Sequence, residues 1–407
     1  MRLRFTLAFA LITMFTIYGP VDNVNASFTD VPSIGTRAEG TGGAMTALAN
    51  DPISALFYNP AALTDIPGRC AEIGMGIVGF PLVYRDLDGS FLTENEFVSL
   101  LPYFAFSSDR FAPIFLGIGL YGSAGTGFDF AKNEAKGIFH HMEAESGNVY
   151  LSPTIAYRFN DKISAGVGLN IAYSKLETEM PLGRYQEEGL SIDADGFCYG
   201  VNIGLLYKPF KSLSLGLRWR SGLDAELEGD AKFLDKNKNV IAKDNVTAHI
   251  YWPDVLTFGV GVHISPKFVL LLDYEWIYYS RFSRKSHLSY DDQMSYFNSP
   301  FLKDMRDARR IHIGCEYLLN AKIVLRAGYL YNRWCLPNKQ TTPLAPGNTY
   351  HTFHLGIKVK ISKKFDIEFA GFKNYHNIRK VTYSETGYTG SYREPSHGID
   401  MGLVYYF

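Results

Sequence analysis

Apolar side chains recur at every second residue in many short segments, and this alternation limits the chain to β-structure. In LSLGLRWR (213–220), leucine and tryptophan share one face, whereas serine, glycine and two arginines share the other. The segments YHTFHLGIKVKI (350–361) and GIDMGLVYYF (398–407) repeat the pattern. Successive strand residues point to opposite faces, so the pattern predicts strands with one apolar face. A soluble sandwich and a membrane barrel both satisfy this pattern.

Charged residues separate these two folds. They recur on the non-apolar face of otherwise apolar segments, at Asp273, Glu275, Arg326, Asp366 and Glu368. A sandwich would need all of these charges to face solvent, whereas a membrane barrel alternates apolar side chains toward lipid with polar ones toward its lumen. Aromatic residues make up 15% of the chain and charged residues only 20%, which also favours aromatic girdles at a membrane.

The alternating segments predict an all-β fold, a 14-stranded antiparallel transmembrane β-barrel over residues 70–407. The expected strands lie near 71–79, 96–108, 111–124, 149–160, 162–177, 195–209, 212–222, 254–264, 267–282, 309–319, 322–332, 350–361, 364–377 and 397–407. The number is even, as single-chain bacterial barrels require. Short turns alternate with long polar stretches such as 125–148 and 223–253, which we expect to be outer loops.

The N-terminus predicts export from the cytoplasm. Arg2 and Arg4 precede an uncharged apolar run, and a small-residue site ending at Ala26 follows. This order is typical of a secretory signal peptide, here residues 1–26. The last residue, Phe407, lies on the apolar face of the last strand, and bacterial outer-membrane barrels commonly present such a residue to their assembly machinery.

Composition excludes several other classes. A net charge of -1 argues against a nucleic acid partner. The four cysteines are widely spaced and predict isolated thiols rather than a disulfide framework or a metal site. The spacing of Asp235, Asn237 and Asn239 matches the start of a calcium loop, but glycine and glutamate are missing at its later positions, so a solvated loop is expected.

One early segment departs from the strand pattern. GGAMTALANDPISALFYNPAAL (42–63) is rich in alanine, reads as helix and closes on Asn59, Pro60 and Ala61. Proline cannot continue a helix and asparagine tolerates turn geometry, so a bend is predicted there.

Six blocks of this chain resemble the FadL-type outer-membrane transporters of long-chain fatty acids and aromatic hydrocarbons, in the family's order. They are the blocks 35–63, 150–177, 196–233, 252–282, 325–371 and 390–407. The resemblance implies a fourteen-stranded barrel whose lumen is closed by an N-terminal hatch, here residues 27–69 with 42–63 as its helical part. It also implies a monomer without a cofactor that carries hydrophobic molecules. Long-chain fatty acids are the expected cargo, and aromatic hydrocarbons are the alternative.

The resemblance further implies lateral release through an opening at a kink in the third strand. The glycine-dense stretch Gly122, Ser123, Ala124, Gly125 and Thr126 is the expected position, although these glycines are equally compatible with simple packing against the hatch. A fatty acid carboxylate would need a cation. The inward-facing candidates are Arg218, Arg220, Arg326 and Lys358, each of which could instead balance a lumenal carboxylate.

Other functional classes remain as alternatives. An enzyme would need a nucleophile and a base on one face, and no such set can be assembled from the sequence. An adhesin would act through the long loops, and a non-selective porin would need an open lumen, which a hatch would close.

Overall fold

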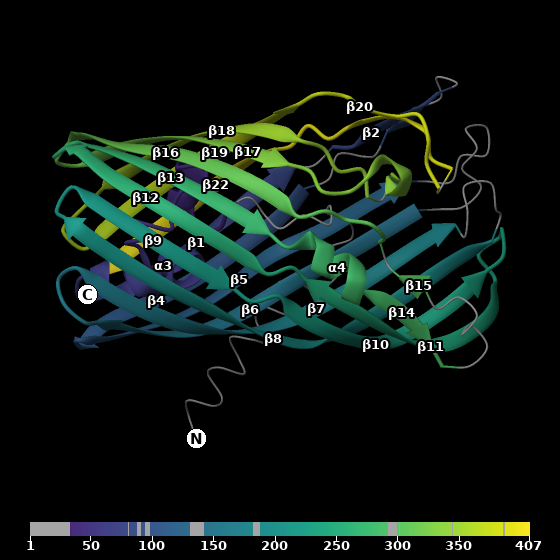
Figure 1. Ribbon diagram of the computed structural model, residues 1–407, viewed down its shortest axis with the longest axis horizontal. Coiled ribbons are helices and arrows are strands. Elements are labelled where there is room, and N and C mark those ends of the chain that lie inside the picture. The colour runs from purple at the N-terminus through teal and green to yellow at the C-terminus, as the bar shows by residue number, and fades with distance from the viewer. Residues whose placement is uncertain are drawn as a thin grey trace.

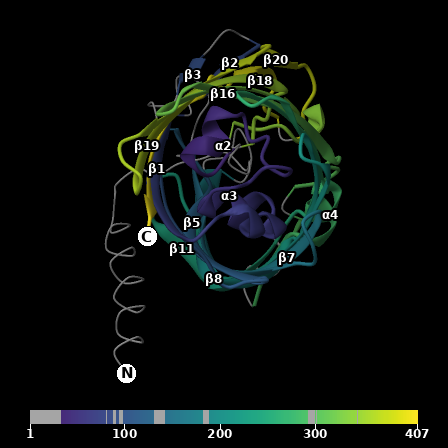
Figure 2. The same cartoon turned by 90° about the vertical axis from the view of Figure 1, so that its left-hand side faces the viewer.

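The computed structural model describes residues 33–79, 81–87, 91–93, 98–130, 142–181, 188–291, 299–300, 302–343, 345–385 and 387–407. The predicted signal peptide, 1–26, lies outside these residues. The described chain forms an elongated barrel with a segment of the N-terminal region inside it (Figures 1 and 2).

The barrel is closed and has fourteen antiparallel strands, which confirms the predicted fold class. Four of these strands are interrupted, so that β9 and β10, β11 and β12, β13 and β14, and β15 and β16 are each two parts of one strand. Its elements are β1 (Arg69–Gly79), β4 (Val98–Phe111), β5 (Ile114–Phe130), β6 (Met142–Arg158), β7 (Ile163–Pro181), β8 (Gly189–Phe210), β9 (Leu213–Arg220), β10 (Leu223–Leu234), β11 (Val240–Trp252), β12 (Val255–Ser265), β13 (Phe268–Ile277), β14 (His287–Tyr290), β15 (Ser299–Pro300), β16 (Ala308–Asn320), β17 (Ile323–Arg333), β18 (Tyr350–Lys360), β19 (Phe365–His376) and β22 (His397–Tyr406). Pairing of β1 with β22, from Cys70–Tyr406 to Gly79–His397, closes the ring.

The two faces of the wall follow the predicted alternation. Leu355 and Ile399 are 70% and 64% exposed on the outer face, whereas the side chains of Arg218, Asp273 and Glu368 are buried inside. Lipid is the solvent of the outer face, so its exposed apolar side chains are compatible with a stable fold.

The expected outer loop at 223–253 was wrong, because this stretch forms β10 and β11. In β10, Leu223, Ala225 and Leu227 are buried, whereas the charged residues between them are exposed. The wall here has an apolar inner face and a charged outer face, the reverse of the pattern facing lipid. Likewise, part of the expected loop 125–148 belongs to β5 and β6.

Residues 33–66, which we call the lumenal segment, lie inside the barrel (Figure 2). The segment contains α2 (Thr36–Gly40), α3 (Pro52–Tyr58) and the 3₁₀ helix η1 (Pro60–Asp65). The predicted helix over 42–63 was therefore wrong for residues 42–51. Gly42 and Gly43 adopt φ angles of 67° and 79°, which end the first helix. Asp51 accepts a hydrogen bond from the N–H of Ser54 at 3.0 Å and caps α3.

At the end of the barrel away from the short turns, β2 (Val83–Asp86), β3 (Phe91–Thr93), β20 (Arg379–Val381) and β21 (Gly390–Arg393) form a small second sheet. The connection after β13 contains α4 (Tyr279–Lys285), and that after β17 contains η4 (Asn338–Gln340). In the described part of the chain, no helix has the length and apolar character needed to cross a membrane.

Candidate functional site

The Asn59-Pro60-Ala61 corner of the lumenal segment rests on glycines of the wall. A Cβ atom at Gly204 would lie 2.0 Å from Asn59 Oδ1, and one at Gly166 would lie 2.5 Å from the Pro60 carbonyl carbon. Asn59 Nδ2 donates to the carbonyl oxygens of Thr46 (2.7 Å) and Leu205 (3.1 Å). The corner therefore ties two parts of the lumenal segment to β8, and the absence of side chains on the wall permits this close approach.

Aromatic rings connect α3 to the barrel wall. The Phe57 ring meets Tyr121 edge-on with centroids 5.8 Å apart, and Tyr121 stacks on Tyr150 at 5.3 Å with an interplanar angle of 11°. Arg218 and Arg220 place their guanidinium carbons 5.2 Å and 4.8 Å from the Phe57 ring centroid. These contacts form one continuous aromatic row from the lumenal segment across β5 to β6.

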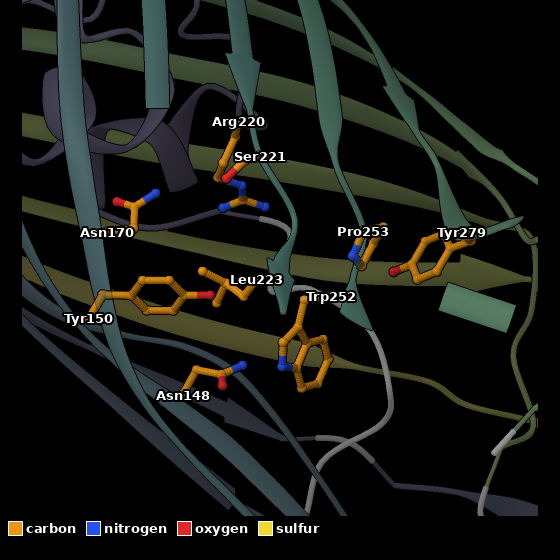
Figure 3. Close-up of a pocket in the computed structure, with 9 residues that line it drawn as sticks. All are labelled: Asn148, Tyr150, Asn170, Arg220, Ser221, Leu223, Trp252, Pro253 and Tyr279. Atoms are coloured by element: carbon orange, nitrogen blue, oxygen red, sulfur yellow. The ribbon is translucent and has the colours of Figure 1, made fainter. Parts of the chain in front are cut away.

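A small pocket, with free space of about 20 Å³, opens beside this row (Figure 3). Its lining residues come from six elements, β6, β7, β9, β10, β11 and α4, and from two breaks between strands; they are Asn148, Tyr150, Asn170, Arg220, Ser221, Leu223, Trp252, Pro253 and Tyr279. That free space holds about one water molecule, so a larger ligand would have to displace side chains. The mixture of aromatic rings with a few polar groups is typical of small-molecule sites.

The polar groups of this pocket are mostly nitrogen donors. The Arg220 guanidinium points into the space between Asn170 and Leu223 (Figure 3). Within the described residues, Asn148 Nδ2 and Trp252 Nε1 are buried and have no hydrogen-bond partner. A buried donor without a partner is costly, so the pocket is suited to a ligand that brings an acceptor.

Breaks in three neighbouring strands create the pocket. The wall is interrupted at Ser221-Gly222 between β9 and β10, at Pro253-Asp254 between β11 and β12, and by α4 after β13. Up to Arg220 the even-numbered residues face inward, and from Leu223 the odd-numbered ones do. Because the inward-facing positions change from even to odd numbers between the two strands, Arg220 and Leu223 both face the same cavity.

The other predicted cations lie on carboxylates. Arg326 donates to Glu316 Oε1 (2.8 Å) and to Glu368 Oε2 (2.5 Å). Lys358 Nζ lies 2.7 Å from Asp366 Oδ2. Arg218 is 1% exposed and lies 3.8 Å from Glu275 Oε2. Of the four candidates, Arg220 alone lines the pocket described above.

Inward-facing carboxylates also hold the lumenal segment. Arg37 of α2 donates to both oxygens of Glu316 at 2.8 Å and 2.7 Å. Asp273 Oδ2 accepts from the N–H groups of Met45 (3.0 Å) and Thr46 (2.8 Å). These inward charges therefore bind the lumenal segment as well as one another.

The stretch 122–126 lies at an incomplete ladder. Within the described parts of β4 and β5, pairing runs from Phe111–Ile114 to Tyr103–Tyr121 and ends there. Beyond it, β5 pairs only with β6, and a register shift falls between Ser123 and Gly125. Such an irregularity leaves strand groups unpaired and bends the strand.

A second cavity, also with free space of about 20 Å³, lies behind this ladder end. It is bounded by Gly35 and Glu39 of the lumenal segment and by the wall residues Leu101, Tyr103 and Gly122. Tyr103 fixes the lumenal segment here, because its hydroxyl oxygen accepts from the Thr36 N–H at 3.1 Å. Tyr121 ends the ladder and stacks on Tyr150 of the first pocket, and the next residue, Gly122, lines the second cavity.

The sequence did not identify Asn148, Tyr150, Asn170, Trp252 or Tyr279 as pocket residues. Alternation shows that Asn148 and Asn170 face inward, but only the register between strands shows that they lie at one level. The sequence signal that could have located the pocket was Trp252-Pro253-Asp254. Proline interrupts a strand, and after the interruption the other set of alternate residues can face inward.

The described residues contain no cluster of three or more histidine, cysteine, aspartate or glutamate side chains suited to a metal ion. The Asp235 carboxylate instead caps its own turn. It accepts hydrogen bonds from the N–H groups of Asn237 and Asn239, both at 2.8 Å, which is the solvated loop expected from the sequence.

Two kinds of comparison with known proteins relate this chain to outer-membrane transport. The family described as "Outer membrane protein transport protein (OMPP1/FadL/TodX)" matches residues 26–402. "Outer membrane protein P1" of Haemophilus influenzae is 23% identical over 370 residues, which cover 78% of each chain. "Long-chain fatty acid transport protein" of Escherichia coli is 21% identical over 345 residues, 75% of each chain.

Solved structures of related barrels have the same fold. A Pseudomonas aeruginosa FadL homologue has a TM-score of 0.81 at 16% identity and covers 94% of this chain and 99% of its own. The Pseudomonas putida toluene transporter TodX has a TM-score of 0.76 at 17% identity and covers 92% and 98%. At these identities the likeness establishes the architecture alone.

Proposed function

Because the chain belongs to the OMPP1/FadL/TodX family of outer-membrane transport proteins, we propose that its cargo is a long-chain fatty acid. The family assignment makes it an outer-membrane protein of a Gram-negative bacterium that transports hydrophobic compounds. Its relatives are transport channels and not enzymes.

One observation carries the choice of a fatty acid. The pocket combines an aromatic and aliphatic lining with the Arg220 guanidinium and with the buried N–H groups of Asn148 and Trp252, which have no hydrogen-bond partner within the described residues. A carboxylate would supply acceptors for these two N–H groups close to the positive charge of Arg220, and hydrogen bonds that involve charged groups are the stronger ones. The Escherichia coli relative named as a long-chain fatty acid transport protein agrees with this choice.

We further propose that the lumenal segment is the hatch and that cargo leaves sideways at 122–126. Tyr121 stacks on Tyr150 of the pocket, and the next residue, Gly122, lines the second cavity at the strand edge where β4 and β5 are no longer paired. An apolar molecule at such an edge would pass into lipid without crossing water.

Uptake of labelled oleate tests both proposals, in a Gram-negative strain that lacks its own fatty acid transporter. Leu101→Cys and Gly122→Cys together place two thiols on the second cavity, and a short thiol-reactive crosslinker that reduction cleaves would bridge the ladder end. We expect uptake to fall on crosslinking and to return on reduction, while each single variant controls for the four native cysteines. Uptake that persists in the crosslinked protein would exclude release at this edge.

Aromatic hydrocarbons are the second candidate cargo, favoured by the rings of Tyr150, Trp252 and Tyr279 in the pocket. Toluene uptake by the same strain distinguishes the two cargoes. A correctly inserted barrel that imports toluene but no oleate would overturn the fatty acid proposal.

A further inference from the structure

Arginine side chains flank two aromatic rings along the outer wall, where β13 and β17 end and β16 begins. We call this set the arginine–aromatic row, and it consists of Arg281, Tyr278, Trp276, Arg309 and Arg333. Trp276 stacks on Tyr278 with centroids 5.9 Å apart and an interplanar angle of 14°. Arg309 lies over the Trp276 ring at 4.8 Å, and Arg281 lies over the Tyr278 ring at 4.9 Å.

Two arginines of the row face each other across neighbouring strands. Arg309 of β16 pairs in register with Arg333 of β17, and both side chains are exposed. Neither forms an ion pair within the described part of the chain. Like charges directly opposite each other destabilise a sheet, unless an anion lies between them.

Acidic groups near the row are already engaged. Asp254 Oδ2 accepts from Arg281 Nη1 at 2.6 Å. Asp307 accepts from Trp276 Nε1 at 3.2 Å and from the Ser280 N–H at 3.1 Å. These carboxylates fix the Arg281 and Trp276 side chains, while Arg309 and Arg333 keep their charge directed outward.

The row lies at the outer boundary of the lipid-facing band. The strands that carry it end in the long connections, whereas the chain terminus Phe407 lies at the short-turn end. Long connections mark the extracellular side of such barrels. Exposed apolar residues lie below the row on the same strands, including Leu272 (45%), Ile311 (37%) and Ile313 (41%).

We propose that the arginine–aromatic row binds the phosphate groups of a phosphorylated glycolipid of the lipid A type in the outer leaflet. The planar guanidinium fork suits phosphate, and stacking on aromatic rings holds two of the three arginines in place before binding. The acyl chains of the same lipid would cover the apolar band beneath the row. This site lies outside the barrel and does not depend on the cargo.

Lipid binding to the purified full-length barrel tests the proposal. The protein would be washed free of native lipid and placed in vesicles of zwitterionic phospholipid containing bis-phosphorylated lipid A. Bound lipid would be counted by native mass spectrometry. Arg309→Gln with Arg333→Gln should bind about ten-fold less lipid A, because hydrogen bonds to charged groups are lost.

A matched variant controls for net charge. Arg110→Gln with Lys267→Gln removes two exposed cations at the short-turn end of the barrel, and its lipid A binding should equal that of the unmodified protein. The proposal would be overturned if the row variant bound as much lipid A as the unmodified protein. It would also be overturned if the unmodified protein bound dephosphorylated lipid A or phosphatidylglycerol as well as it binds bis-phosphorylated lipid A.

Thermal unfolding distinguishes a binding site from a structural role. Without lipid A the row variant should unfold at the same or a higher temperature, because the repulsion between Arg309 and Arg333 is gone. With lipid A only the unmodified protein should gain stability. A row variant that is less stable in both conditions would contradict the proposed role.

Discussion

The two sides of the barrel lumen hold the lumenal segment by different interactions. On the side of β16 to β19, buried ion pairs connect Arg37, Glu316, Arg326 and Glu368. On the side of β5 to β9, aromatic rings and glycine contacts hold α3 and the Asn59 corner. We call these the ion-pair side and the aromatic side.

The difference indicates which half of the segment can adapt to cargo. Breaking a buried ion pair leaves a charge without compensation, so the ion-pair side should have one allowed arrangement. Ring contacts are less directional, and the first pocket lies on the aromatic side. The second cavity lies between the two sides, because Glu39 of α2 and Phe372 of β19 line it together with Gly122 of β5. We infer that α2 is fixed and that any adjustment to cargo occurs around α3.

The largest expected effect comes from breaking the ion-pair side. Arg326→Met leaves Glu316 and Glu368 without a shared cation, and breaking a buried pair costs about 3–5 kcal/mol. We expect a clear loss of unfolding free energy in urea and faster proteolysis of the lumenal segment.

Lys322→Met is the control for that variant, since Lys322 lies exposed in the turn before β17. If both variants unfolded alike, the ion pairs would not anchor the segment.

A smaller effect should follow from filling the wall beneath the Asn59 corner. In Gly204→Ala the added methyl group would lie 2.0 Å from Asn59 Oδ1 and 2.9 Å from Pro60 Cδ. Overpacking of this kind costs about 1–3 kcal/mol. Unfolding in urea measures the loss, and labelling of a cysteine introduced in η1 would report displacement of the corner.

Gly261→Ala is the matched control, because its methyl group would meet the nearest atom, Leu271 Cδ2, at an ordinary 3.4 Å. Similar losses in both variants would mean that the corner has no special fit to the wall.

On the aromatic side, Arg220→Gln separates the two candidate cargoes. Removing the charge should lower the apparent affinity for oleate about ten-fold, because a charge-assisted hydrogen bond is lost. Toluene has no acceptor for Arg220, so its uptake should be unchanged. Concentration series of both compounds measure the effect, and Arg220→Lys should recover part of the oleate affinity. Equal losses for oleate and toluene would show that Arg220 only shapes the pocket.

The sequence predicted the wall well because lipid imposes a simple rule on it. Every membrane strand must present apolar residues at every second position, and fourteen segments did so. The rule reverses above the membrane, where Leu223 and Leu227 face inward and charges face solvent. For this reason β10 and β11 resembled polar loops.

The site was less predictable because it depends on register and on pairing between distant residues. Arg218, Arg220, Arg326 and Lys358 are all inward cations in the sequence. Only the fold shows that Glu316 and Glu368 lie on Arg326, whereas Arg220 reaches a pocket built from β6, β7, β11 and α4. Glu316 gave no sequence signal of its own, since it lies in CEYLL without clear alternation.

The smallest expected effect is a pH dependence at the outer end of the ion-pair side. Glu394, between β21 and β22, accepts from Asn348 Nδ2 at 3.2 Å, and its N–H donates to His376 Nε2 at 2.8 Å. Burial raises the pKa of its carboxyl to about 7, although Asn348 and the nearby Arg379 oppose the shift. The folded state therefore keeps a proton that the unfolded state releases between the ordinary carboxyl pKa and about 7. Local stability should be full below that window and fall as pH rises through it.

Hydrogen exchange in β20 and β21 should show protection that declines with pH more steeply than in Glu394→Gln, whose amide cannot ionise. Parallel profiles in the two proteins would show that Glu394 does not set the stability of this region.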